Sequence, residues 1–167
     1  LVAQGATHLA LLGRSAPSEA ARLAVDKLEA KGAAVFITQA DVSQADHLER
    51  ALDEIAQSMP PLRGLIHAAG VLDDGILLHQ TWNRFEKVFA PKVHGAWHLH
   101  KLTRDLPLDF FVMFSSTASL LGSPGHGNYA AANSFMDALA HYRHQLGLPA
   151  VSINWGGWAE IGLAARR

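Results

Sequence analysis

The chain has 167 residues, of which 49% are hydrophobic and 17% are charged, and its formal net charge is −1. This length and composition suit one folded domain over residues 1–167 and exclude a disordered chain. No basic tract is present, so binding to nucleic acid or to an anionic membrane is not expected. The absence of cysteine excludes disulfides and thiolate metal sites and is compatible with a cytoplasmic location.

Short apolar runs predict strands, and longer stretches with capping residues predict helices. Strands are expected over residues 8–12, 33–39, 62–67, 109–114 and 150–154. The helices expected between them cover about 17–31, a stretch from residue 43 to about 58, a long stretch over about 81–104, and a stretch that begins near 128. Ser43 is the candidate N-cap of the second helix. This alternation predicts a doubly wound, Rossmann-like parallel sheet with helices on both faces.

Polar groups gather where the fourth strand ends and the next helix begins. The strand stops at Ser115 and Ser116, and a loop rich in glycine and proline, residues 122–127, leads into the helix. Tyr129 and Asn133 are four residues apart and therefore share one face of that helix. A hydroxyl at a strand end with a phenol and an amide on the following helix is the way an α/β sheet presents groups to ligands at its carboxyl edge.

This stretch resembles the active-site segment of short-chain dehydrogenase/reductases and, more closely, that of ketoreductase domains of modular polyketide synthases and animal-type fatty acid synthases. Short-chain reductases in general carry Tyr-x-x-x-Lys, whereas here Asn133 stands four residues after Tyr129. In polyketide ketoreductases the lysine comes from the preceding helix, and Lys92 stands there. This exchange is more specific than either residue alone, and the resemblance extends over nearly the whole chain.

The resemblance implies roles for four residues. Tyr129 would protonate the carbonyl oxygen of a ketone, Ser116 would hydrogen-bond that oxygen, and Lys92 would stabilise the phenolate. Asn133 would hold backbone or water and so organise the proton relay. Seen alone, each has an ordinary alternative. A tyrosine can simply start a helix, a serine can cap, an asparagine can be a polar helix residue, and a lysine is commonly solvated.

The resemblance also implies NADPH as the cofactor. Arg14 follows the first strand, where a cation favours the 2′-phosphate of NADP, and Ser15 is a second candidate contact. Asp41 and Val42 resemble the pair that contacts the adenine ring through a carboxylate and a backbone N–H. Asp41 fits equally well as a helix-capping residue.

The small residues after the third strand are further cofactor candidates, because none of them carries a bulky side chain that would keep a ligand from the backbone. These residues are Ala68, Ala69 and Gly70. A dinucleotide fold should also open with a strand and a G-x-G-x-x-G turn, and residues 1–6 instead resemble the end of the helix that follows such a turn. In the usual strand order that strand is central. We therefore expect a truncated, partial ketoreductase catalytic subdomain that lacks this strand and turn, and the helical lid after Trp158, and is poorly active alone.

A second motif bears on stereochemistry. Leu72, Asp73 and Asp74 resemble the Leu-Asp-Asp fingerprint of B-type polyketide ketoreductases, which implies a D-configured β-hydroxyl product. Other positions that bear on the type are Leu121, where A-type enzymes have tryptophan, Pro124 and Asn128, which fit the B-type, and His126, where B-type domains usually have glutamine. Two acidic residues beside Gly75 would also make an ordinary turn.

The leading hypothesis is NADPH-dependent reduction of a β-ketoacyl thioester on an acyl carrier protein, beside neighbouring domains of a polyketide synthase. A free-standing short-chain reductase acting on a small ketone and a non-catalytic structural remnant are the alternatives. Histidine pairs at helical spacing, His94 with His98 and His141 with His144, suit chelation, but no third ligand falls into register, so no metal is expected.

Overall fold

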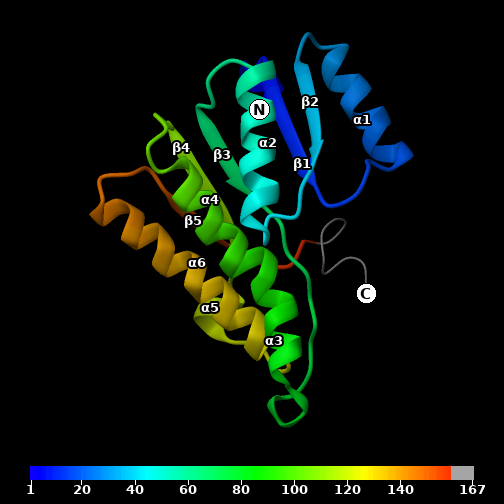
Figure 1. The fold of residues 1–167 in the computed structure, drawn as a ribbon. Helices are drawn as coiled ribbons and strands as arrows, with labels where there is room; N and C mark the ends of the chain where they lie inside the picture. The colour runs from blue at the N-terminus through cyan, green and yellow to red at the C-terminus, as the bar shows by residue number, and fades with distance from the viewer. Residues whose placement is uncertain (159–167) are drawn as a thin grey trace.

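The computed structural model describes residues 1–158 and has an α/β fold of parallel strands and helices (Figure 1). The strands are β1 (His8–Gly13), β2 (Ala34–Gln39), β3 (Gly64–His67), β4 (Phe110–Ser116) and β5 (Val151–Trp155). The α-helices are α1 (Glu19–Glu29), α2 (Ala45–Ser58), α3 (Trp82–Phe89), α4 (Gly95–Thr103), α5 (Ala118–Leu121) and α6 (Gly127–Gln145), with short 3-10 turns η1 (Val2–Gln4) and η2 (Leu77–His79) and a π-helical turn η3 (Ala90–His94). This order confirms the predicted fold class, and the lid expected after Trp158 lies outside the described residues.

The strands form two parallel sheets. β1 pairs with β2 in one sheet, and the other sheet has the order β3-β4-β5. Within residues 1–158 no strand joins β1 to β3, and this break falls where the usual strand order places the first strand of a dinucleotide fold. All five arrows point the same way in Figure 1, so the carboxyl ends of both sheets lie toward one edge of the molecule.

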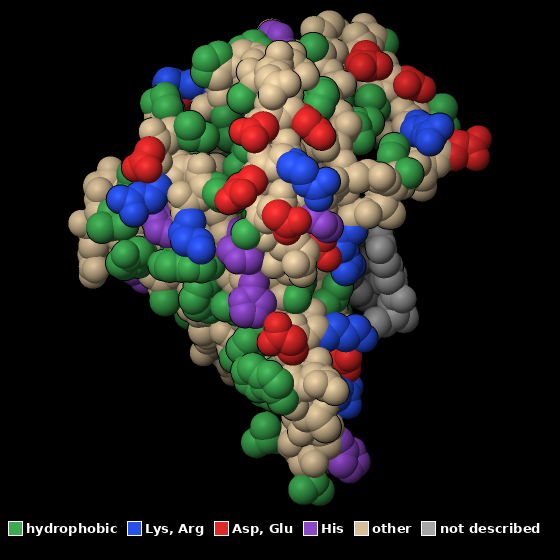
Figure 2. Space-filling view, viewed as in Figure 1, with side chains coloured by type: hydrophobic (Ala, Val, Ile, Leu, Met, Phe, Trp, Pro, Cys, Tyr) green, Lys and Arg blue, Asp and Glu red, His purple; other side chains and the backbone are tan. Residues whose placement is uncertain are grey.

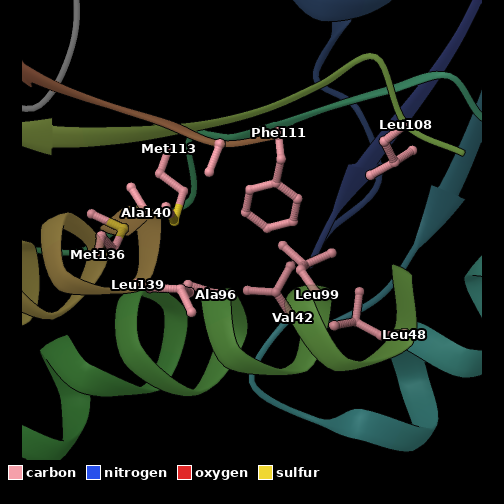
Figure 3. Close-up of a cluster of buried hydrophobic side chains, with 11 residues drawn as sticks. Val42, Leu48, Ala96, Leu99, Leu108, Phe111, Met113, Met136, Leu139 and Ala140 are labelled. Atoms are coloured by element: carbon pink, nitrogen blue, oxygen red, sulfur yellow. The ribbon is translucent and has the colours of Figure 1, made fainter. Parts of the chain in front are cut away.

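The hydrophobic core lies between β4 and the helices α2, α4 and α6 (Figure 3). Phe111 and Met113 alternate along β4, as a strand buried on one face requires, and both are fully buried. The helical side chains packed against them are Leu48, Ala96, Leu99, Met136, Leu139 and Ala140. This packing fixes α4 and α6 against β4, and these are the elements that border the site described below.

The long helix predicted over residues 81–104 is interrupted, and this correction matters for the site. A π-helical turn, Ala90–His94, separates α3 from α4. Pro91 lacks the N–H that an α-helix would use there, which explains why the regular ladder fails at this point. The carbonyl of Pro91 instead lies 3.0 Å from Nε2 of the buried His67. Lys92 lies in this turn and is only 4% exposed.

Ser43 does not cap α2, which also corrects the prediction. The helix begins at Ala45 with Gln44 at the N-cap, and Gln44 makes no side-chain cap bond. Oδ1 of Asp41 accepts from the backbone N–H of Ser43 at 2.9 Å and from its hydroxyl at 2.7 Å. The carboxylate therefore builds a turn ahead of the helix and holds the hydroxyl that would have capped it, so neither residue is the cap.

On the face drawn in Figure 2, acidic and basic side chains are interspersed, so neither positive nor negative charge predominates there. Among the described residues, no helix combines the length and the apolar character needed to span a membrane.

Candidate active site

A cavity of about 570 Å³ opens where β3, β4 and β5 end. Parallel α/β sheets bind ligands at this edge. The rings of Phe114, Trp155 and Trp158 form one wall, with the two tryptophan centroids 5.0 Å apart. The predicted site residues that line the cavity are Ala68, Gly70, Leu72, Lys92, Ser116, Leu121, His126 and Tyr129.

Lys92, Asn133 and Tyr129 meet beside this cavity. Nζ of Lys92 donates to Oδ1 of Asn133 at 3.0 Å and to the carbonyl oxygen of Phe114 at 2.9 Å. The same Nζ lies 5.2 Å from the centre of the Tyr129 ring. Nδ2 of Asn133 donates to the carbonyl oxygen of Tyr129 at 2.7 Å. The amide thus connects the ammonium to the helical turn that carries the phenol.

Burial controls the charge of Lys92. Desolvation lowers the pKa of Lys92 to about 8, and the negative charge of Asp137 acts in the opposite direction. Burial, together with the charge of Lys92, also lowers the pKa of His67 to about 4. At neutral pH a buried ammonium therefore lies beside a neutral imidazole, and the alternative of a solvated surface lysine is wrong.

The two serines at the end of β4 have different environments. Ser115 is buried, and its hydroxyl donates to the carbonyl oxygen of Asn133 at 3.4 Å. Oγ of Ser116 accepts from the N–H of Ala118 at 3.2 Å and stands at the cavity. Because this oxygen accepts from backbone, the hydrogen of the hydroxyl remains available to donate into the cavity.

The two loops that carry the proposed stereochemical residues are joined to each other. The N–H of Gly75 donates to the carbonyl oxygen of Gly125 at 2.8 Å, and Gly125 has a left-handed φ of 78°. Nε2 of His126 lies 3.4 Å from the carboxylate of Asp74. His126 therefore connects the loop before Tyr129 to the Leu-Asp-Asp segment through a contact that strengthens when the imidazole is protonated.

Asp73 anchors the first of these loops to α3. Its carboxylate accepts from Nε of Arg84 at 2.7 Å and from Nζ of Lys87 at 2.9 Å. These hydrogen bonds, with that from Lys87 the larger, hold the pKa of Asp73 below its ordinary value. Nδ2 of the buried Asn128 donates to the carbonyl oxygen of Asp73 at 2.8 Å. Leu72 and Leu121 line the cavity, whereas Pro124 is exposed in the second loop.

The chain is similar to known proteins over nearly its full length. The family model described as "KR domain" matches residues 1–160. The chain belongs to the KR domain family. It is 44% identical over 160 residues to a mycocerosic acid synthase-like polyketide synthase of Mycobacterium tuberculosis, and 41% identical over 162 residues to the phthioceranic/hydroxyphthioceranic acid synthase of Mycobacterium bovis. These matches cover 96% and 97% of the chain, which spans 8% of each relative.

A solved structure of an A1-type ketoreductase superposes with a TM-score of 0.91 at 42% identity, covering 96% of the chain and 34% of that ketoreductase. A ketoreductase domain from the bacillaene assembly line gives a TM-score of 0.89 at 40% identity, covering 95% of the chain and 39% of that domain's chain. The relatives and the structures together confirm the predicted family, the ketoreductase domains of polyketide synthases.

The predicted cofactor residues of this KR domain fall into two places. Arg14 and Ser15 are exposed at the end of β1, outside the cavity lining. Burial acts to raise the pKa of Asp41, but the hydrogen bonds from Ser43 and the charge of Arg14 hold it below its ordinary value. Val42 is buried in the core, so only its backbone is left to meet a ligand.

The small residues after β3 lie closer to Lys92. Ala68 and Gly70 line the cavity, and Ala69 packs against the core. A Cβ at Gly70 would lie 3.0 Å from Cε of Lys92. Glycine at this position therefore makes room for the lysine stem, a role that the sequence prediction did not include.

No group of three or more His, Cys, Asp or Glu side chains within residues 1–158 is arranged to hold a metal ion. His94 and His98, the histidine pair on the α3–α4 segment, each contact a different group. His94 lies 3.0 Å from a carboxylate oxygen of Glu86, and Nδ1 of His98 lies 3.4 Å from the carbonyl oxygen of Val42.

Sequence reasoning missed a half-buried polar network behind Ser116. Its centre is Asp137, whose carboxylate accepts from the hydroxyls of Ser119 and Ser152 and from the amide of Asn154. One signal was available, because Asp137 follows Asn133 by four residues and so continues the face of α6 that carries Tyr129.

Proposed function

We propose that this ketoreductase uses NADPH to reduce a β-ketoacyl thioester, carried by an acyl carrier protein within a polyketide synthase, to the β-hydroxyacyl form. The observation that supports this most is the arrangement of Lys92, Asn133 and Tyr129 next to Ser116 in one cavity. Membership of the KR domain family supports the reaction class, and the synthase relatives support neighbouring domains as partners.

The residues present fit a phosphorylated dinucleotide. Ala68 and Gly70 leave the cavity floor open at the end of β3, and Arg14 and Ser15 are exposed at the end of β1, toward the same edge of the molecule. The guanidinium of Arg14 suits a 2′-phosphate, and Ser15 adds a hydroxyl donor. When bound, NADPH supplies the hydride for the reduction.

The proton chemistry belongs to the chain. The hydroxyls of Ser116 and Tyr129 donate to the carbonyl oxygen of the substrate, where negative charge develops during reduction. Tyr129 then transfers its proton to this oxygen. The ammonium of Lys92 stabilises the resulting phenolate across the 5.2 Å between Nζ and the ring centre. Asn133 holds Lys92 in place for this task.

B-type stereochemistry is the finer part of the proposal. Leu72 lines the cavity, and the loop that bears it is held against the loop before Tyr129 by the contact between Asp74 and His126. A substrate entering beside Leu72 would present one face of its ketone and yield the D-configured β-hydroxyl. Two similar structures are described as A-type and A1-type ketoreductases, and chiral analysis of the product distinguishes the two types.

The test supplies a β-ketoacyl group as a carrier-protein thioester, as a short-thiol thioester and as a simple ketone, each with NADPH or NADH. It is run on the 167-residue chain and on a longer protein that embeds it in the full length of a ketoreductase. NADPH-dependent formation of the hydroxyacyl thioester, resolved by chiral chromatography and mass spectrometry, is the expected result. Equal turnover of the simple ketone would favour a free-standing reductase, and no reduction by the folded, NADPH-bound longer protein would favour the structural remnant.

A further inference from the structure

We propose that Asp137 is a positioning residue of this site, which holds the Ser116 end of β4 in place. The inference rests on the proposed function, because it assigns Asp137 a part in that reaction. Asp137 lies on α6 two turns after Tyr129 and one turn after Asn133, so all three occupy one face of the helix.

The carboxylate of Asp137 accepts hydrogen bonds from two other elements. Oδ2 accepts from Oγ of Ser119 in α5 at 2.6 Å and from Nδ2 of Asn154 in β5 at 3.0 Å. Oδ1 accepts from Oγ of Ser152, also in β5, at 2.5 Å. Burial acts to raise the pKa of Asp137, but these hydrogen bonds outweigh it and hold the pKa below its ordinary value. The group is therefore an anion at neutral pH.

The donors that meet Asp137 also meet the end of β4. Oγ of Ser119 lies 2.8 Å from the carbonyl oxygen of Ser116, and Nδ2 of Asn154 lies 3.3 Å from the same oxygen. Nδ2 of Asn154 also lies 3.2 Å from Oγ of Ser115. The carboxylate thus orients Ser119 and Asn154, which contact the backbone of Ser116. Because the backbone of Ser116 is held in this way, its hydroxyl is held at the cavity.

Asp137 also acts on the buried ammonium. Its negative charge works against the desolvation that lowers the pKa of Lys92. Tyr129 on α6 and His67 on β3 also lie near Lys92, and His67 is neutral at pH 7. On its far side Asp137 shares a second hollow with the exposed His141 and His144 of its own helix. Asp137 therefore favours the protonated form of Lys92.

The experiment replaces the carboxylate by its uncharged isostere, Asp137→Asn, and compares it with Ser119→Ala and with Glu54→Gln. Ser119→Ala removes one donor to Asp137 but keeps the charge. Glu54 is an exposed carboxylate on α2 that accepts from the hydroxyl of Thr38, so its variant is the matched control. Two quantities are measured for each protein. The first is the NMR titration of Lys92 Nζ, with the signal assigned by its loss in Lys92→Met. The second is the dependence of kcat and KM on pH.

In Asp137→Asn we expect Lys92 to lose its proton at lower pH than in the parent, and the alkaline limb of the kcat profile to move in the same direction. At pH 7 kcat should fall by about tenfold, with KM changed less than about twofold. Ser119→Ala should lower kcat without moving the Lys92 titration, and Glu54→Gln should change neither. If Asp137→Asn fails to fold, Asp137→Glu, which keeps the charge and moves it, provides the same two readouts and should retain the Lys92 titration.

An unchanged kcat in folded Asp137→Asn or in Ser119→Ala would overturn the positioning of Ser116. A lowered kcat with an unchanged Lys92 titration in Asp137→Asn would support the proposal and assign the whole effect to Ser116. A parent protein that binds NADPH but reduces no β-ketoacyl thioester would overturn the proposed function instead.

Discussion

The ammonium of Lys92 lies 3.0 Å from the amide oxygen of Asn133, although 41 positions separate the two residues in sequence. The contact forms because a π-helical turn carries Lys92 inward while α6 presents Asn133 one turn after Tyr129. The cost of burying the ammonium is offset by two acceptors, the Asn133 amide and the Phe114 carbonyl. This pair is the structural basis of the proposed proton transfer.

Reduction should decline as the pH rises through about 8, the value to which burial lowers the pKa of Lys92. The direction of this pH dependence follows from the positive charge of Lys92. The protonated lysine supports Tyr129, and this form is lost above its pKa. A kcat profile from pH 6 to 9 checks this, with Lys92→Met expected to lose activity by about 100-fold at pH 7, where the parent lysine is protonated, and by less at pH 9. Lys101→Met, at an exposed position of α4, is the control, and a parent profile that stays flat through pH 8 to 9 would contradict the role.

Gly70→Ala should disturb Lys92 from the opposite side. The new Cβ would stand 3.0 Å from Cε of Lys92, so the lysine stem must shift by a few tenths of an ångström. We expect kcat to fall by roughly three- to tenfold, because small displacements of supporting groups are costly, while the melting temperature changes little. At Gly127 a Cβ would meet nothing within 4 Å, so Gly127→Ala should leave kcat unchanged. Equal effects of the two substitutions would argue against a specific contact with Lys92.

Arg14→Ala should weaken NADPH binding without weakening NADH binding. The lost guanidinium would pair with a 2′-phosphate that NADH lacks, and charge-assisted hydrogen bonds of this kind are worth about 1.5–3 kcal/mol, or roughly 10- to 100-fold in Kd. Fluorescence titration with both nucleotides measures this ratio. Arg50→Ala, an exposed arginine on α2, controls for the change in net charge. A parallel loss of affinity for both nucleotides would place the 2′-phosphate elsewhere.

His67 should make stability depend on pH between about 6.5 and 4. Its pKa falls from 6.5 to about 4 on folding, so in this window the unfolded chain binds a proton that the folded chain excludes. Stability contributed by the neutral imidazole is therefore complete above pH 6.5 and is lost as the pH falls, by about 2 kcal/mol between pH 7 and 5.

Urea unfolding of the parent, His67→Gln and His8→Gln at pH 7 and 5 checks this prediction. The glutamine at position 67 retains a donor for the Pro91 carbonyl but does not titrate, so its pH-dependent loss should be smaller by that amount. His8 is exposed, and its variant should behave like the parent. The account of His67 would be wrong if all three proteins lost equal stability.

The parts of this fold that follow local rules could be predicted from the sequence. Each of the five strands lies within a residue or two of its predicted range, because apolar runs bounded by glycine, proline and polar residues define them. The helix from Gly127 was also expected, since Tyr129 and Asn133 have helical spacing. What these rules could not supply was the π-helical turn at Pro91, because a proline predicts a disturbed helix without saying how the chain accommodates it.

The family pattern names residues of the candidate site but not the tertiary contacts around them. Lys92 and Asn133, which the pattern names from separate segments, lie within hydrogen-bond distance of each other. Asp137, in contrast, gains its surroundings from Ser119 and Asn154, which lie 18 and 17 positions away on other elements. A one-dimensional pattern places Asp137 on the right face of α6 but does not reveal what faces it.

The most direct test of the proposed function compares the two tyrosines of the chain. Tyr129→Phe and Tyr142→Phe each remove one phenolic hydroxyl, but Tyr129 lines the cavity whereas Tyr142 is exposed beside Trp97 and His100. In the longer, ketoreductase-length protein with a β-ketoacyl thioester, Tyr129→Phe should lower NADPH oxidation by about 100- to 10,000-fold, the contribution of a general acid, and Tyr142→Phe should match the parent. Full activity in Tyr129→Phe, with NADPH still bound, would contradict the account.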